Sequence, residues 1–188
     1  MLRHDLPSGA HLRLFEEADA GELYALTDRN RAHLEPWLPW VPATRSAEDS
    51  LAFIRMTRRQ LAENNGMSLA IVRDGAIVGT AGFHHVDWPN RLTMIGYWLA
   101  ADAQGRGTMT DAVRALVDHA VRGWGLERVE ILAAVDNARS RAIPERLGFV
   151  NEGVKRRAEV VGDRVLDLVV YAMLAGDWRG PGSPERNH

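Results

Sequence analysis

Residues 104–110 form a short glycine-rich segment that restricts the fold of this chain more than any other part of its sequence. The preceding residues 94–99 have the composition of a β-strand, and apolar residues recur at helical spacing from Val113 to Trp124. Glycines between a strand and a helix let the backbone approach a ligand closely and adopt positive φ angles. Backbone N–H groups then converge where the helix macrodipole is positive, and such a turn binds phosphate or pyrophosphate.

The two commonest glycine-rich phosphate loops do not match this segment. A P-loop requires a Lys after its last glycine, and none follows Gly107. A Rossmann loop requires a third glycine where this chain has Thr110. A structural turn at the start of a helix has the same composition. Taken alone, the segment therefore leaves phosphate binding and plain turn chemistry equally open.

The composition is that of a single globular domain. Of the 188 residues, 46% are hydrophobic and 26% are charged, which suffices for one sizeable core. A net charge of −2 provides no basic field for nucleic acid or for an anionic membrane surface. The chain has no Cys, which excludes disulfides, thiolate zinc sites and a Cys nucleophile. Residues 1–9 contain no signal-peptide core and no run of about 18 apolar residues occurs, so we expect a cytoplasmic protein.

Periodicity and turn signals predict the element order βααβββαβαββ, a mixed α/β layer. Two helices are expected to begin at capping boxes, Asp19 with Glu22 and Ser46 with Asp49. Prolines exclude a regular helix from residues 35–44.

Two hairpins are predicted from their turn residues, Asp74 with Gly75 and Gly162 with Asp163. The strands are expected at residues 11–15, 67–72, 77–86, 94–99, 129–135, 149–160 and 165–174.

Several segments occur in the order found in the GCN5-related N-acetyltransferase (GNAT) superfamily, which the chain resembles over residues 8–178. The glycine segment matches the family's pyrophosphate loop, Q/R-x-x-G-x-G/A, through Gln104 and Gly107, although Met109 stands where that pattern has Gly or Ala. The other matching segments are residues 37–40 (WLPW), 95–99 (IGYWL), 136–149 with their LGF exit, and 170–174 (VYAML). They are most similar to the ribosomal-protein (RimL/RimJ-like) branch.

The resemblance implies an α/β fold with a mixed, mostly antiparallel central sheet, splayed middle strands and flanking helices. It implies one acetyltransferase domain over residues 1–179, and the polar, Pro/Gly-rich composition of residues 180–188 predicts a mobile tail. Acetyl-CoA would be the cosubstrate, and no metal is expected. The residues that the resemblance assigns to coenzyme A are Trp98, Leu99, Ala100, Gln104, Gly105, Arg106, Gly107, Thr108, Met109, Thr110, Asn137 and Ser140.

The function implied by the resemblance is acetyl transfer from acetyl-CoA to a primary amine by direct attack on the thioester. The acceptor would be the N-terminal α-amine of a ribosomal or other protein, or a small-molecule amine, and the enzyme would be a homodimer. Met94 and Met109 depart from the family pattern, so a non-catalytic module that binds or senses coenzyme A stays an alternative.

The catalytic residues implied by the resemblance are Leu99, whose backbone N–H would face the thioester carbonyl, and Ser140, which would donate a proton toward the sulfur. The commoner family acid, a Tyr, is replaced here by Pro144. The alternative for Ser140 is a capping role at the start of its helix.

The general base is less clearly marked, because Met94 stands where many relatives have Glu. The remaining candidates are His84 on one face of its strand, or His85 and Asp87 on the other. Water is a further alternative, since an α-amine has a pKa of about 7.7–8.0 against about 10.4 for Lys. The missing carboxylate therefore favours an acceptor amine of low pKa.

Three tryptophans complete the candidates. Trp37, Trp40 and Trp88 would either line the acceptor groove, with residues 36–42 as a mobile lid, or belong to the core and a dimer contact. His119 has no partner at metal-ligand spacing, and we expect it at the surface.

Overall fold

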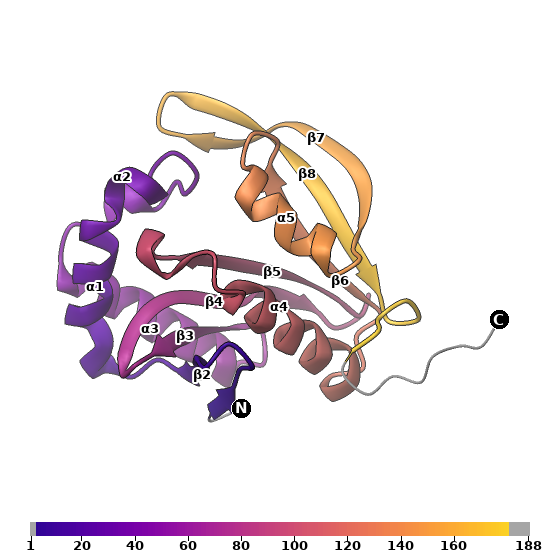
Figure 1. Ribbon diagram of the computed structural model, residues 1–188, viewed down its shortest axis with the longest axis horizontal. Helices are drawn as coiled ribbons and strands as arrows, with labels where there is room; N and C mark the ends of the chain where they lie inside the picture. Colours follow the sequence, from indigo (N-terminus) through magenta and orange to yellow (C-terminus); the bar gives the residue numbers. More distant parts are fainter. Residues whose placement is uncertain (1–2, 181–188) are drawn as a thin grey trace.

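The computed structural model describes residues 3–180, and these residues form a single eight-stranded sheet flanked by helices (Figure 1). The strands are β1 (Arg3–Asp5), β2 (His11–Leu14), β3 (Met67–Arg73), β4 (Ala76–Asp87), β5 (Leu92–Leu99), β6 (Arg128–Ala134), β7 (Val150–Val161) and β8 (Arg164–Leu174). Their order in the sheet is β1-β2-β3-β4-β5-β6-β8-β7. Every neighbouring pair is antiparallel except β5 and β6, which confirms the predicted fold class.

The helices cover the sheet and connect its strands. The α-helices are α1 (Ala20–Arg29), α2 (Arg31–Leu34), α3 (Ala47–Ala62), α4 (Thr108–Asp118) and α5 (Ala138–Arg146). Three short 3₁₀ turns, η1 (Glu17–Asp19), η2 (Val41–Ala43) and η3 (Ala101–Ala103), and one π-helical turn, η4 (His119–Gly123), complete them. Helix α4 lies in front of the sheet in Figure 1 and α3 lies behind it.

The middle of the sheet is split. Strands β5 and β6 pair only at their beginnings, and the last pair is Met94 with Glu130. Beyond it, β5 continues to Leu99 and β6 to Ala134 without facing each other. Figure 1 shows the resulting wedge between the β1–β5 half of the sheet and the half with β6, β8 and β7. The predicted splay of the middle strands is confirmed, and it leaves one side of β5 without a partner strand.

The predicted hairpins are confirmed. Asp74 and Gly75 both have positive φ angles, 51° and 79°, as a type I′ turn between β3 and β4 requires. The other hairpin joins β7 and β8 and turns at Gly162. The short strand β1 was missed because its three residues are exposed and carry no apolar pattern.

One of the two predicted capping boxes is wrong. Asp19 does not cap α1, because the chain enters that helix directly from η1 and no free helix start exists there. The Asp19 carboxylate instead accepts from the Glu16 N–H (2.8 Å), and Glu22 accepts from the Ile77 N–H (2.6 Å). The box of Ser46 and Asp49 at the start of α3 is confirmed.

Apart from Gly180, the predicted mobile tail lies outside the described residues. Within the described part of the chain, no helix is long and apolar enough to cross a membrane.

Candidate active site

The glycine loop opens α4 in the way its sequence indicates. Gly105 and Gly107 both have φ angles of +76°, and Gly107 is the N-cap residue of α4. No side chain among the described residues caps this helix, and no described atom lies within 4 Å of a Cβ built on either glycine. Open space therefore adjoins the N–H groups of the first helical turn, as an anionic ligand requires.

The first three residues of α4 can meet a ligand only through their backbone. The side chains of Thr108, Met109 and Thr110 are buried. Met109, which departs from the family pattern, packs in the main hydrophobic core. These three residues were predicted to contact the cofactor, and the structure makes their peptide N–H groups available for that contact but not their side chains.

Two arginines form hydrogen bonds with the start of α4, one from an element before this helix in the chain and one from an element after it. Arg73 of β3 donates to the Thr108 hydroxyl (2.6 Å), and Arg146 of α5 donates to the Thr110 hydroxyl (2.9 Å). These guanidinium groups fix the first turn and add positive charge beside it. A positive field there favours the phosphates of a nucleotide-like cosubstrate.

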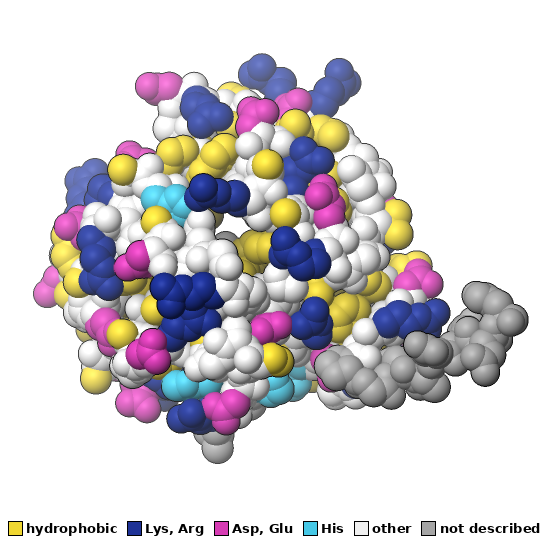
Figure 2. Space-filling model, in the orientation of Figure 1, with side chains coloured by type: hydrophobic (Ala, Val, Ile, Leu, Met, Phe, Trp, Pro, Cys, Tyr) yellow, Lys and Arg dark blue, Asp and Glu magenta, His cyan; other side chains and the backbone are white. Residues whose placement is uncertain are grey.

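Gln104 connects the loop with both halves of the molecule. Its side-chain nitrogen lies 2.8 Å from His33 Nε2 of α2, and its oxygen accepts from Arg139 of α5 (3.0 Å). Arg106, in the loop itself, is exposed. Figure 2 shows a hollow in the middle of this face with apolar side chains inside and Arg or Lys side chains around it.

The free side of β5 presents alternate backbone groups to the wedge. Ala100 donates its N–H to the Val78 carbonyl of β4 (2.8 Å), so this predicted contact has its N–H already occupied. Because N–H groups alternate along a strand, Trp98 also points its N–H toward β4, whereas Leu99 points its N–H the other way. Of the three predicted residues at the end of β5, Leu99 alone has a backbone donor directed toward the wedge.

Ser140 lies in the first turn of α5, across the wedge from β5. The N-cap of this helix is Asn137, whose side chain accepts from the Ser140 N–H (3.1 Å). The interpretation of Ser140 as the cap is therefore wrong. Its hydroxyl lies 3.4 Å from the Tyr97 hydroxyl, and Tyr97 donates to the Ser140 carbonyl (3.0 Å). Burial raises the pKa of Tyr97 above its ordinary value, so the hydroxyl stays protonated.

A β-bulge decides where His84 lies. Two residues of β4, His84 and His85, stand opposite the single residue Met94 of β5, which interrupts the alternation assumed from the sequence. The His84 ring lies over Gly96, where a Cβ would collide with it. His84 is solvent-exposed as a whole residue, while its ring packs closely against the Gly96 backbone. This partial desolvation lowers the pKa of His84, so the ring is neutral near pH 7.

The other candidates from β4 have structural roles. Asp87 accepts from the N–H and the side-chain amide of Asn90 (3.0 and 2.9 Å) and so closes the β4–β5 turn. The His85 carbonyl accepts from the Thr93 hydroxyl (2.7 Å), which satisfies a backbone group that the bulge removes from the ladder.

Two of the three singled-out tryptophans lie near the open end of β5. The Trp40 ring lies 6.0 Å from that of Trp98, centroid to centroid. Trp37 packs against the small cluster that contains Ala134 and Leu166, and the Arg164 guanidinium lies 5.9 Å above its ring. The segment that carries these two tryptophans, residues 36–44, therefore bridges from the β5 half of the sheet to the tip of the β7–β8 hairpin.

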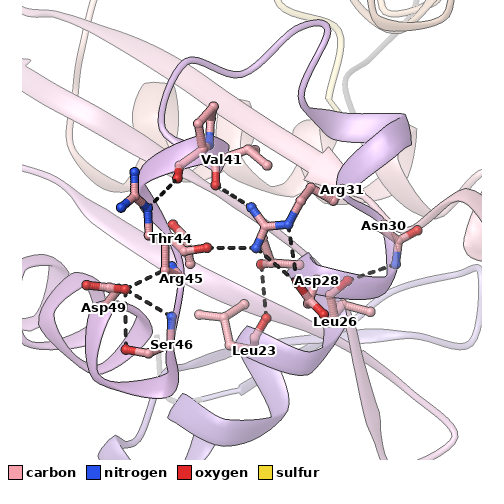
Figure 3. A network of polar contacts seen from close by, with 12 residues as sticks. Leu23, Leu26, Asp28, Asn30, Arg31, Val41, Thr44, Arg45, Ser46 and Asp49 are labelled. Atoms are coloured by element: carbon pink, nitrogen blue, oxygen red, sulfur yellow. Dashed lines mark hydrogen bonds and ion pairs between the residues drawn. The ribbon is translucent and has the colours of Figure 1, made fainter.

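The bridging segment is braced from below by Arg31 (Figure 3). Its guanidinium donates to the carbonyls of Val41 (2.7 Å) and Thr44 (2.8 Å) and pairs with Asp28 (3.0 Å). Two hydrogen bonds from Arg31, which Asp28 of α1 holds in place, give the segment a fixed frame, and this suits a wall of the site better than the predicted mobile lid.

Trp88 and His119 lie away from the glycine loop, in an aromatic cluster at the β4–β5 turn. Trp88 donates to the Asn64 carbonyl (2.6 Å) and packs edge-on against Trp124 at 5.7 Å. His119 is half-buried, with its ring 4.7 Å from Trp124, so the expectation of a surface residue is wrong. This cluster sits at the β4–β5 turn, at the opposite end of β5 from the glycine loop.

Glu159 is a candidate that the sequence analysis missed. It is half-buried among exposed neighbours on β7, and no side chain among the described residues forms a hydrogen bond or ion pair with its carboxylate. Desolvation raises the pKa of its carboxyl group. Its register partner is Leu166, so both side chains share the face of the hairpin that holds Trp37. Glu159 differs from other surface glutamates only in the burial of this hairpin face, and no sequence pattern within β7 reveals that burial.

Within residues 3–180, no group of three or more His, Asp or Glu side chains is arranged to hold a metal ion.

The splayed sheet, with a glycine loop at a helix N-terminus beside it, defines an acyltransferase site for a phosphate-bearing thioester. The sequence matches the Acetyltransferase (GNAT) domain over residues 10–150, and the chain belongs to this family. It is an acetyl-CoA-dependent N-acetyltransferase.

Three similar proteins agree with this assignment. The chain is 39% identical to the putative ribosomal N-acetyltransferase YdaF of Bacillus subtilis (strain 168), with 90% of this chain and 93% of the relative covered. A structure of RimL, a ribosomal L7/L12 alpha-N-protein acetyltransferase in complex with coenzyme A, superimposes with a TM-score of 0.86 at 27% identity, covering 90% and 96%. The microcin C7 self-immunity acetyltransferase MccE, in complex with acetyl-CoA and AMP, gives 0.83 at 29% identity, covering 89% and 97%.

Proposed function

We propose that this N-acetyltransferase acts on the N-terminal α-amine of a protein, with a ribosomal protein as the first candidate. The observation that carries the proposal is the junction of the splay, where Met94 stands opposite the bulge at His84 and His85 and the carboxylate of its β6 partner, Glu130, is taken up by Arg128 (2.7 Å). An amine of low pKa is partly neutral near pH 7 and needs little help from a base. The similarity to RimL and YdaF supports the same acceptor class.

The two faces of β5 would divide the work. The Tyr97 side chain lies on the face of β5 that meets α5 and Ser140. Position 96 and the Trp98 side chain lie on the opposite face, where the His84 ring packs against Gly96. Acetyl-CoA would lie with its pyrophosphate at the N-terminus of α4 and its thioester at the wedge. The acceptor amine would enter from the side of His84.

Three protein groups would then act on the transfer. The Leu99 N–H would donate to the oxyanion that forms when the amine attacks the thioester carbonyl. His84, neutral because of its lowered pKa, would take the proton that the amine loses. Ser140 would donate its hydroxyl proton to the departing thiolate, and the proton taken up by His84 would return to the Ser140 oxygen through solvent. The nitrogen–carbon bond forms, the carbon–sulfur bond breaks, and the products are an amide and coenzyme A.

Glu159 is the second candidate for the base. Its raised pKa makes it a better proton acceptor than an ordinary surface carboxylate. Its place on the hairpin face near Trp37 puts it on the wall of the proposed acceptor side.

A small-molecule amine is the competing acceptor, because the MccE structure holds AMP beside acetyl-CoA. A peptide that contains one free α-amine and one internal Lys separates the proposals. We expect mass spectrometry to find the acetyl group on the α-amine at pH 7. The same peptide with a blocked N-terminus is the matched control. Acetylation mainly on Lys, or only on small amines in a parallel panel, would refute the proposal.

We further propose a cytoplasmic homodimer. Val150, Val154 and Val160 of β7 are each more than half exposed and give the hairpin an apolar surface that a second copy could cover. Light scattering after size-exclusion chromatography should give twice the monomer mass of 20.9 kDa.

A further inference from the structure

Helix α5 contains a proline at a position where it removes a backbone hydrogen bond. Pro144 lies inside the helix, four residues after Ser140. A proline has no N–H, so the Ser140 carbonyl cannot form the usual bond from residue i to residue i+4. A carbonyl left without a donor in a partly buried place is costly.

A side chain from β5 supplies the missing donor. The Tyr97 hydroxyl donates to the Ser140 carbonyl at 3.0 Å and thereby spans the wedge between the two halves of the sheet. Tyr97 comes three residues after Met94, the last β5 residue paired with β6.

The same hydroxyl also contacts the side chain of residue 140. Tyr97 has one proton, which it gives to the carbonyl, so toward the Ser140 hydroxyl it can only accept (3.4 Å). The proton on Ser140 Oγ is thus held by a long, weak bond, and it can turn toward a stronger acceptor such as a thiolate.

We propose that Tyr97 is a positioning residue, which replaces the N–H that Pro144 lacks and so holds Ser140 at the wedge with its hydroxyl proton available. The inference rests on the proposed role of Ser140 as the proton donor. Tyr97 itself is not the donor, because its only proton is committed to the carbonyl. Burial, which raises the pKa of Tyr97, keeps this proton in place over the working pH range.

A cycle of two substitutions tests the link between these residues. Tyr97→Phe removes the hydroxyl and keeps the ring. Pro144→Ala restores an N–H that can bond to the Ser140 carbonyl within the helix. In the parent background we expect Tyr97→Phe to lower kcat about tenfold, which is part of the roughly 10²-fold that a general acid contributes at the low end, and to change both KM values less than about twofold. In the Pro144→Ala background the same substitution should lower kcat by less than about threefold.

Tyr171→Phe is the matched control. The Tyr171 hydroxyl also bonds to α5, but through the side chains of Arg141 (2.9 Å) and Glu145 (2.5 Å) and not through the Ser140 carbonyl. We expect it to lower the melting temperature without the loss of kcat, and Pro144→Ala should not change its effect.

Thermal unfolding provides a readout that does not depend on activity. Tyr97→Phe should lower the melting temperature by several degrees in the parent and by clearly less beside Pro144→Ala. Equal losses of kcat or of melting temperature in both backgrounds would overturn the inference, and so would normal kcat in the Tyr97→Phe enzyme. Failure of the proposed function would be seen in other measurements: acetylation of a different acceptor in the peptide assay, or full activity of the Ser140→Ala enzyme.

Discussion

Replacing Gly107 by Ala should weaken coenzyme A binding more than it weakens the fold. Gly107 has a φ of +76° and stands at the N-terminus of α4, beside open space. An added Cβ meets no protein atom among the described residues, so it would occupy the space that a pyrophosphate needs. The strained backbone would also turn the first N–H groups of α4 away from their present direction.

The structure sets the size of both effects. A side chain in the left-handed region costs about 1–2 kcal/mol, which corresponds to a loss of roughly 2–8 °C in the melting temperature of a domain of this size. For the cosubstrate we expect the Kd to rise at least about tenfold, or about 1.4 kcal/mol. The two losses are separable because only the second requires a ligand at the loop.

Gly75 offers a matched control in the β3–β4 hairpin. Its φ is +79°, and a Cβ built there also meets no described atom within 4 Å. Gly75→Ala should therefore cost the same stability while leaving the Kd for coenzyme A unchanged. Isothermal titration with coenzyme A and thermal unfolding on the same preparations measure both quantities. If Gly107→Ala binds coenzyme A as the parent does, the loop is only a structural turn. If Gly75→Ala weakens binding equally, the effect reflects general destabilisation.

Four other substitutions test the proposed catalytic residues and one buried ion pair. Ser140→Ala should lower kcat about 10²-fold with little change in coenzyme A affinity, measured by steady-state kinetics, and near-normal kcat would exclude the proton-donor role. If His84 is the base, kcat/KM rises with pH through a pKa below its usual 6.5, and His84→Ala removes this limb. If Glu159 is the base, Glu159→Gln removes a limb that lies above the usual carboxyl value of 4.5. Burial raises the pKa of Asp19, but its bonds from Arg13 and the Glu16 N–H outweigh this and lower it below 3.8, so its stabilisation is complete at neutral pH and lost as pH falls through the lowered value. Asp19→Asn should cost about 2 kcal/mol at pH 7 in denaturant unfolding, with the difference shrinking below about pH 4, and an unchanged difference there would contradict the assignment.

Features that depend on neighbouring residues were predictable from the sequence. The positive φ angles of Gly105 and Gly107, the turn at Asp74 and Gly75, and the alternation of strands and helices follow from short-range backbone preferences. The match to the GNAT pattern gave the splay of the middle strands, which residue periodicity alone does not indicate. A break in strand pairing leaves no signature within either strand.

Features that join distant parts of the chain required the tertiary structure. The bulge at His84 and His85 is a matter of register against β5, so alternation along β4 alone misplaced the faces. The half-burial of Glu159 depends on its pairing with Leu166 of β8, which no pattern within β7 reveals.

The contact of Tyr97 with Ser140 spans 43 positions in the sequence. The arginines that surround the start of α4 come from β3 and α5 and look scattered in the sequence. The sequence determined most of the elements and the positive φ angles of the glycine loop, because these follow from the conformational limits of a few adjacent residues. Packing decided which donors face the wedge, because hydrogen bonds and desolvation act between whatever atoms the folded chain brings within a few ångströms.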